Sequence, residues 1–191
     1  CLKVRDTPAL RGTVDDLVAA GIPVFTLVTD LPQTERKAYI GLDNTNAGRT
    51  AAYLLSLCLL EKDSHVLTVR SQDAFFGETE RYEAFRAELA RLRPDCRVSD
   101  VSGGAGLWAD TASRVSAELS RSGRVDAVYS IGGGNSAILE ALAEHGCKDV
   151  TFIAHDLDRE NVRLLEEGVI TFVLHHDLVA DIRSLFAGVM T

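Results

Sequence analysis

The sequence predicts an α/β fold with mainly parallel sheets, and two observations carry that prediction. Short apolar runs rich in β-branched residues recur along the chain without alternating polar residues, as is typical of strands buried on both faces. Amphipathic stretches with helical spacing lie between these runs, and this alternation is typical of right-handed β-α-β crossovers. The expected strands cover residues 22–28, 38–42, 65–69, 97–101, 125–131, 150–154 and 170–174.

The helices are expected from apolar stripes, and the first one has a recognisable end. An apolar stripe over residues 10–18 is followed by Gly21 and Pro23. Glycine accepts the left-handed cap of a helix and proline cannot continue it, so the helix should stop there. Further helices are expected over 44–61 and 177–189, and around the pairs Phe85 and Leu89, Val115 and Leu119, Ile138 and Leu142, and Val162 and Leu165.

Length, composition and charge bound the class of protein. The 191 residues exceed the roughly 150 of a typical domain. With 46% hydrophobic and 25% charged residues, the composition excludes disorder, collagen and coiled coil. No apolar run approaches the roughly 20 residues of a membrane-spanning helix, so no membrane partner is expected. The net charge of −8 repels phosphate backbones, so this segment should bind nucleic acid poorly by itself, although it fits the regulatory part of a longer DNA-binding chain.

The cysteines and the first residue bear on cellular location. Cys1, Cys58, Cys96 and Cys147 are scattered without a C-x-x-C pair, so a disulfide framework is not expected. Cys58 lies in a run of leucines and is expected to be a buried, small apolar residue. These features favour a reduced, cytoplasmic setting. The chain opens at Cys1 rather than at methionine, so we expect that a leader peptide or a further N-terminal domain would not be visible.

Polar groups that follow the strands are the candidates for a binding site, because open parallel sheets bind ligands beyond the carboxyl ends of their strands. Carboxylates and amides pair with neighbouring hydroxyls, and aromatic rings cover the apolar face of a sugar ring. The combination therefore predicts a pocket for a small polyhydroxyl ligand. The candidates are Thr29, Asp30, residues 71–76, Trp108, residues 132–135, His155, Asp156, Asp158, His175 and His176.

Other roles compete for several of these groups. A carboxylate at a strand end often caps the next helix, and Asp43 is expected to do so rather than to bind ligand. Aromatic residues such as Trp108 and Phe75 more often pack between parts of the protein than stack on a ligand. Residues 132–137 fit G-x-G-x-x-A, with Asp156 near the position of a ribose-binding acid, which keeps a nucleotide-cofactor enzyme open as an alternative. That fingerprint belongs in the opening β-α-β unit, however, and here several β-α units precede it.

Metal and catalytic sites are not expected. His155, Asp156, His175, His176 and Asp177 have ligand-type side chains, but they follow two separate strands and adjacent histidines on a strand point in different directions. The G-x-S-x-G, P-loop and H-E-x-x-H patterns do not occur. We therefore expect a binding protein without a cofactor or metal, rather than an enzyme.

Several strings, taken in order, resemble one family. They are GIPVFTLVTD over 21–30, YIGLDN over 39–44, ERYEAF over 80–85, DAVYSIGGGNSAILEAL over 126–142, FIAHD over 152–156 and ITFVLHH over 170–176. Together they are similar to the effector-binding domain of lactose-repressor (LacI) type transcription regulators. The same fold serves the periplasmic type I sugar-binding proteins. The resemblance covers nearly the whole chain.

The resemblance implies the periplasmic-binding-protein-like I fold, in which two Rossmann-like lobes with parallel sheets are joined by a hinge and hold the ligand in their cleft. Residues 1–43 and 176–191 would form the first, N-terminal lobe, which would be incomplete. Residues 44–175 would form the second lobe. The helix-turn-helix of LacI-type regulators is not in this sequence.

The resemblance also implies roles for single residues. Arg81 matches an arginine that commonly contacts the sugar, and Asp156 matches an aspartate that commonly binds hydroxyls. His176 stands where many members have glutamine. Where many members have Asn-Asp, this chain has a glycine run, and either Asn135 or backbone N–H groups would replace the missing amide. The expected ligand-binding set is Thr29, Asp30, Phe75, Arg81, Trp108, Asn135, Asp156 and His176.

The function implied is that of an effector-sensing domain of a LacI-family regulator. It would bind a sugar or similar small polyhydroxyl ligand between the lobes and, as a homodimer, control DNA binding through the missing N-terminal domain. A periplasmic sugar-binding protein of an ABC importer, with the same pocket, is the first alternative. A nucleotide-cofactor-binding Rossmann enzyme is the second.

Overall fold

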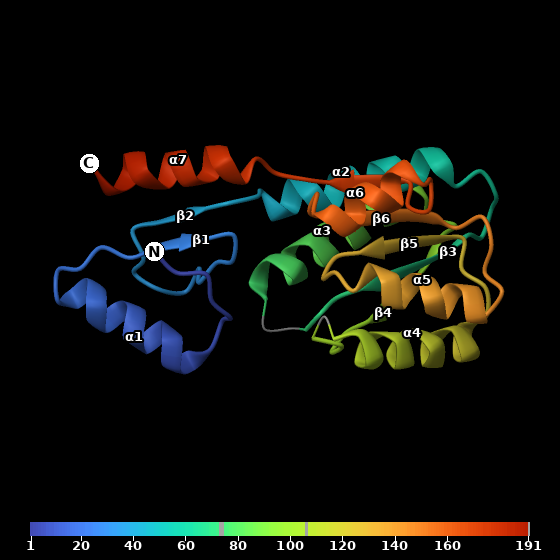
Figure 1. Cartoon of the computed structure of the whole chain (residues 1–191), viewed down its shortest axis with the longest axis horizontal. Helices are drawn as coiled ribbons and strands as arrows, with labels where there is room; N and C mark the ends of the chain where they lie inside the picture. Colours follow the sequence, from blue (N-terminus) through green and yellow to red (C-terminus); the bar gives the residue numbers. More distant parts are fainter. Residues whose placement is uncertain (73–74, 106, 191) are drawn as a thin grey trace.

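The computed structural model describes residues 1–72, 75–105 and 107–190 of the chain. Over these residues the chain forms seven helices and seven strands, and every strand pair is parallel. Figure 1 shows a small group of elements, which includes both ends of the chain, joined by extended segments to a larger group with a central sheet. The predicted α/β class with parallel sheets is confirmed.

The larger group is built on a parallel sheet. Its strands are β3 (His65–Val69), β4 (Arg97–Val101), β5 (Ala127–Ser130), β6 (Thr151–His155) and β7 (Phe172–Leu174). They lie in the order β4-β3-β5-β6-β7. The chain therefore moves outward from β3 to β4 and then returns to the other side of β3. At such a change of direction a crevice opens beyond the carboxyl ends of the two inner strands, here β3 and β5.

Helices cover both faces of this sheet. They are α2 (Asn44–Cys58), α3 (Phe76–Leu92), α4 (Trp108–Ser122), α5 (Asn135–Glu144) and α6 (Arg159–Glu166). Leu67 and Val128 join a core with residues of α4 and α5, whereas Val66 and Tyr129 join a second core with residues of α2 and α3. Every residue of β3 and β5 is buried, as apolar runs without alternation predict.

The small group consists of β1 (Phe25–Leu27), β2 (Ala38–Ile40), α1 (Pro8–Ala19) and α7 (Leu178–Val189). The two strands pair in parallel, and α7 contacts both, so the last helix returns to the N-terminal part of the chain (Figure 1). Val14 and Leu31 are fully buried in its core. The lobe boundaries expected near Asp43 and His176 stay a prediction, and Thr191 lies outside the described residues.

Some element bounds differ from the prediction. The strand expected over 22–28 begins after Pro23, which has no backbone N–H to donate, and ends before Val28, whose φ is 66°. α2 ends at Cys58, where the backbone becomes extended. The helix expected around Val162 and Leu165 is α6, and its most buried apolar residue is Leu164, at 4% exposure, whereas Leu165 is 38% exposed.

Three further results concern caps, cysteines and membrane helices. The prediction that Asp43 caps a helix is confirmed, since its Oδ1 accepts a hydrogen bond from the backbone N–H of Asn46 at 2.9 Å.

All four cysteines lie within the described residues and are free. Cys58 is partly exposed rather than buried, because it is the last residue of α2 and the chain turns outward after it, with Leu60 88% exposed. Among the helices that the structure describes, none is both long and apolar enough to cross a membrane.

Candidate functional site

A cavity of about 230 Å³ lies at the carboxyl ends of β3, β5 and β6, and residues of the small group line its other side. Its volume is slightly under the roughly 300–1,000 Å³ typical of small-molecule pockets. Its position is the one at which open parallel sheets bind ligands. The lining residues are Lys3, Val28, Thr29, Phe75, Gly77, Glu78, Arg81, Ile131, Gly132, Gly133, Gly134, Asn135, His155, Asp156, Asp158, Glu160 and Asn161.

The structure brings together five of the eight predicted binding residues. Residues from the small group, from α3, from the loop after β5 and from the end of β6 converge on the cavity. Of the range 71–76, residues 73 and 74 lie outside the described residues. The predicted residues that line the cavity are Thr29, Phe75, Arg81, Asn135 and Asp156, and those outside its lining are Asp30, Trp108 and His176.

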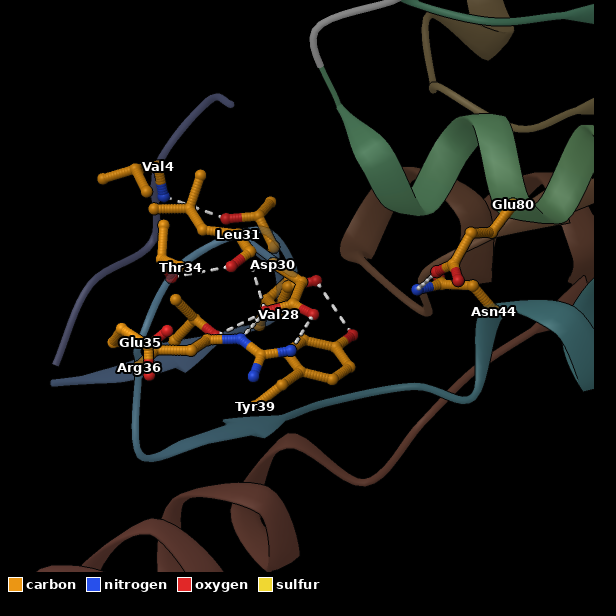
Figure 2. Close-up of polar contacts among 12 residues, drawn as sticks. Val4, Val28, Asp30, Leu31, Thr34, Glu35, Arg36, Tyr39, Asn44 and Glu80 are labelled. Atoms are coloured by element: carbon orange, nitrogen blue, oxygen red, sulfur yellow. Dashed lines mark hydrogen bonds and ion pairs between the residues drawn. The ribbon is translucent and has the colours of Figure 1, made fainter. Parts of the chain in front are cut away.

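Asp30 lies in the small group, and its carboxylate is already satisfied there. Its Oδ1 accepts hydrogen bonds from Thr26 Oγ1 at 2.7 Å and from the backbone N–H of Leu31 at 2.8 Å. The Arg36 guanidinium donates to both carboxylate oxygens, from Nε to Oδ1 at 2.5 Å and from Nη2 to Oδ2 at 2.6 Å (Figure 2). In this structure Asp30 thus braces the loop between β1 and β2 and lies outside the cavity lining, and its expected ligand role stays a prediction.

Trp108 and His176 also have other positions than expected. Trp108 is the first residue of α4 and is 54% exposed, so its ring stands on the surface at a helix start. The Nδ1 atom of His176 lies 2.5 Å from Oδ2 of Asp181 in the first turn of α7. That contact ties the imidazole to the helix rather than to the cavity.

Arg81 reaches the cavity wall in a fixed orientation. Its Nε donates to Oδ1 of Asn44 at 2.8 Å, and its Nη1 donates to the carbonyl of Ile131 at 3.2 Å. Asn44 is itself buried at the start of α2, and its Nδ2 donates to Glu80 at 3.3 Å (Figure 2). Gly48 allows α2 and α3 to come close enough for this contact, because it has no side chain. A Cβ at this position would collide with the backbone oxygen of Arg81. The guanidinium is thus an anchored donor.

Two buried amides, Asn135 and Asn161, form a relay in the wall. Asn161 Nδ2 donates to the carbonyls of His155 at 2.9 Å and Asp156 at 2.7 Å, which fixes the orientation of that amide. Its Oδ1 then accepts from Asn135 Nδ2 at 2.6 Å. The Oδ1 of Asn135 is left buried without a hydrogen-bond partner among the described residues. A buried acceptor in this state costs about 1–3 kcal/mol, and a donor from a ligand would remove that cost.

Two lining residues other than glycine have left-handed backbone conformations, Val28 with φ 66° and Asp156 with φ 67°. This conformation is uncommon outside glycine and is an outlier for a β-branched residue such as Val28. Residues held in such conformations cluster at ligand sites. The Asp156 side chain is exposed, and its carboxylate has no hydrogen-bond or ion-pair partner in the described part of the chain.

Sequence reasoning missed Glu78, a buried carboxylate in the first turn of α3. It accepts hydrogen bonds from the backbone N–H of Ser71 at 2.7 Å and from Ser71 Oγ at 2.5 Å. Burial raises the pKa of its carboxyl, and the Ser71 hydrogen bonds offset only part of that effect. A Cβ at Gly132 would collide with the Ser71 nitrogen, so this glycine serves close packing. In the sequence, an acidic residue near a helix start looks like an ordinary partner of the helix dipole. Its contact with Ser71 therefore cannot be predicted from the sequence.

His155 supplies an uncharged part of the wall. Its Nε2 lies 2.7 Å from the hydroxyl of Tyr129, and both residues are buried. Burial lowers the pKa of His155 well below its usual value, and the nearby charges of Arg81 and His176 lower it further. Burial likewise raises the pKa of Tyr129. Within residues 1–72, 75–105 and 107–190, no group of three His, Cys, Asp or Glu side chains is placed to hold a metal ion.

Comparison with known families gives one match. A family model described as a periplasmic binding protein domain matches residues 1–180. No curated protein matches the chain.

Solved structures show the same fold. GanP, a glucose-galactose binding protein from Geobacillus stearothermophilus, is 19% identical over 94% of this chain, with a TM-score of 0.83. A myo-inositol binding protein from Caulobacter is 19% identical over 95%, with a TM-score of 0.84. An ABC transporter solute-binding protein from Burkholderia graminis, in complex with D-arabinose, is 22% identical over 95%, with a TM-score of 0.83. The chain spans 64%, 63% and 65% of these three proteins, less than two thirds of each.

Proposed function

From the premise that the chain belongs to the periplasmic binding protein domain family, we propose that it binds a sugar or similar small polyhydroxyl ligand in the cavity. One observation carries the proposal. The wall combines the anchored guanidinium of Arg81 with the Asn135 oxygen and the Asp156 carboxylate, both of which have no partner within the described residues. Each hydroxyl of a polyol both donates and accepts hydrogen bonds, so rigid acceptors beside a rigid donor suit such a ligand.

The role that we propose is solute binding for an ABC importer. The solved structures most similar in fold include proteins named for binding a sugar or myo-inositol, and one is named as a solute-binding protein of an ABC transporter. A LacI-type regulator would use the same cavity, and the homodimer, DNA binding and cytoplasmic location expected from the sequence belong to that alternative. Nothing in the described part of the chain favours it over the importer role.

A thermal-shift screen against neutral monosaccharides, sugar alcohols and inositols tests ligand binding. A ligand that binds only the folded state stabilises it by RT ln(1 + [L]/Kd), or about 2.7 kcal/mol at 100 times Kd. We expect one or more of these compounds to raise Tm in a concentration-dependent manner. If none raises Tm at millimolar concentration, the proposed function is wrong.

Fractionation of the source cells tests the importer role separately. With antibodies against this chain, we expect the protein outside the cytoplasmic fraction, and we expect the chain to be released or exposed without cell lysis. Recovery in the cytoplasmic fraction together with bound DNA contradicts the importer role and supports the regulator alternative.

A further inference from the structure

The part of the cavity lining beside the start of α6 is rich in hydrogen-bond acceptors. This part, called the α6 end below, consists of Asn135, Asp156, Asp158 and Glu160. The carboxylate of Asp158 accepts from the backbone N–H of Asn161 at 2.8 Å, and that of Glu160 accepts from the hydroxyl of Ser136. Asp156 keeps its whole carboxylate available, since no partner for it exists in the described ranges.

The buried oxygen of Asn135 points independently to a ligand. Asn135 is 5% exposed, and its Oδ1 has no hydrogen-bond partner in the part of the chain that the structure describes. The amide cannot turn round and present its N–H instead, because Asn161 Oδ1 needs that donor. Asn161 cannot turn either, because its own Nδ2 serves two backbone carbonyls. Any polar ligand atom that meets Asn135 Oδ1 must therefore be a donor.

The balance of charge on the wall agrees with this. The cations on the lining are Lys3, from the small group, and Arg81, whose Nε and Nη1 are occupied by Asn44 and the carbonyl of Ile131. The carboxylates on the lining are Glu78, Asp156, Asp158 and Glu160, so they outnumber the cations. An anionic group placed at the α6 end meets like charge, whereas an ammonium group meets opposite charge.

We propose that the α6 end accepts only hydrogen-bond donors, so that the ligand is a neutral or ammonium-bearing polyol whose hydroxyl or ammonium group reaches Asn135 and Asp156. A carboxylate or phosphate at this end is rejected, because it brings no donor to Asn135 Oδ1 and repels the Asp156 carboxylate. The inference rests on the proposed function and specifies the ligand class of the same cavity.

Matched sets of sugars test this inference by isothermal titration calorimetry on the chain at neutral pH. The sets are D-galactose, D-galactosamine and D-galacturonate; D-glucose, D-glucosamine and D-glucuronate; and D-ribose with D-ribose 5-phosphate. In each set that contains a binder, we expect the acidic or phosphorylated member to bind at least about tenfold more weakly than the neutral one. An acidic member that binds as tightly as its neutral counterpart overturns the inference and leaves the proposed function standing. If no member binds and no compound of the thermal-shift screen raises Tm, both the inference and the proposed function are wrong.

Removal of a single charge gives the second readout. In Asp156→Asn, we expect the ratio of neutral to acidic affinity to fall about tenfold, because the charge is lost while an amide oxygen still accepts. Asparagine also tolerates the left-handed conformation. Asp149 lies just before the start of β6, outside the cavity lining, and is also an exposed aspartate with a left-handed backbone (φ 55°). Asp149→Asn is therefore the matched control, in which we expect the ratio of neutral to acidic affinity to stay unchanged.

An unchanged ratio in Asp156→Asn overturns the inference. Circular dichroism checks that each variant folds. If Asp156→Asn does not fold, Glu160→Gln on the exposed start of α6 provides the same readout, with an expected change of about threefold because solvent screens its charge. An unchanged ratio in that variant counts equally against the inference.

Discussion

Asp30 and Asp156 are both aspartates that follow a strand on the way into the cavity region, yet the structure uses them in opposite ways. Three donors surround the Asp30 carboxylate: the Thr26 hydroxyl, the backbone N–H of Leu31 and the Arg36 guanidinium. Figure 2 shows the pair of Asp30 and Arg36. The carboxylate of Asp156 has no such partner in the described residues. The difference teaches that the donors around a carboxylate decide whether it can serve a ligand.

The two strand ends differ electrostatically as well. Burial acts to raise the pKa of Asp30, but the hydrogen bonds from Arg36 and Thr26 outweigh it, so the pKa of Asp30 is lowered. Asp30 is therefore a charged brace within the small group. At the end of β6, the backbone is left-handed at Asp156 and held by Asn161, and the side chain has no partner among the residues that the structure describes. One end is built for stability and the other is open to a ligand.

Removal of the brace should have the largest effect. Arg36→Met leaves the Asp30 charge buried with only its hydroxyl and amide donors. Loss of one partner of a buried ion pair costs about 3–5 kcal/mol, and partial exposure of Arg36 reduces this to about 2–3 kcal/mol of the free energy of unfolding. Urea denaturation measures the change.

Arg163→Met is the matched control for this variant. Arg163 pairs with Glu167 at 2.7 Å on the surface of α6, with both side chains about half exposed, and such pairs contribute about 0–1 kcal/mol. If Arg36→Met and Arg163→Met lose the same free energy, the contrast between the brace and the open end is wrong.

The sequence predicted where strands end but not which side chains are free there. The apolar runs placed β3, β5 and β6, and from them the position of the cavity, because parallel strands share one carboxyl edge. The ion pair between Asp30 and Arg36 was missed, since Arg36 looks like an ordinary charged residue of a turn. Asn161 was missed because its three side-chain hydrogen bonds depend on how α6 packs beside β6, which no local pattern encodes.

Loss of the amide relay should have the next largest effect. Asn161→Ala removes the side-chain donor to the carbonyls of His155 and Asp156 and the acceptor of the Asn135 N–H, and each such loss in a buried place costs about 1–3 kcal/mol, partly recovered by water. We expect the free energy of unfolding to fall by about 2 kcal/mol, and ligand affinity to fall at least about tenfold because Asn135 and Asp156 lose their support.

Asn46→Ala separates the relay from helix propensity. Asn46 and Asn161 occupy the same position of their helices, three residues after a capping aspartate that accepts their backbone N–H, but Asn46 is exposed. Its replacement should change stability by less than about 0.7 kcal/mol, the range of helix propensities. Equal losses in the two variants would show that the relay contributes nothing.

The smallest expected effect is on the pH dependence of stability, which should differ between the strand ends at Asp30 and at His155. The folded-state pKa of His155 lies well below the 6.5 of an unfolded histidine, so the unfolded state takes up a proton that the folded state refuses as pH falls below about 6.5. Stability due to His155 is complete above that pH and is lost toward its folded pKa, by up to about 1.4 kcal/mol per pH unit. The lowered pKa of Asp30 also makes stability fall as pH falls, but only from about its usual 3.8 downward, so mild acid weakens the β6 end first.

His155→Gln should flatten the urea-derived stability curve between pH 6.5 and 5, whereas His145→Gln, on the exposed end of α5, should leave the slope as in the wild type. An unchanged slope in His155→Gln would mean that the buried imidazole is not what couples the cavity wall to pH.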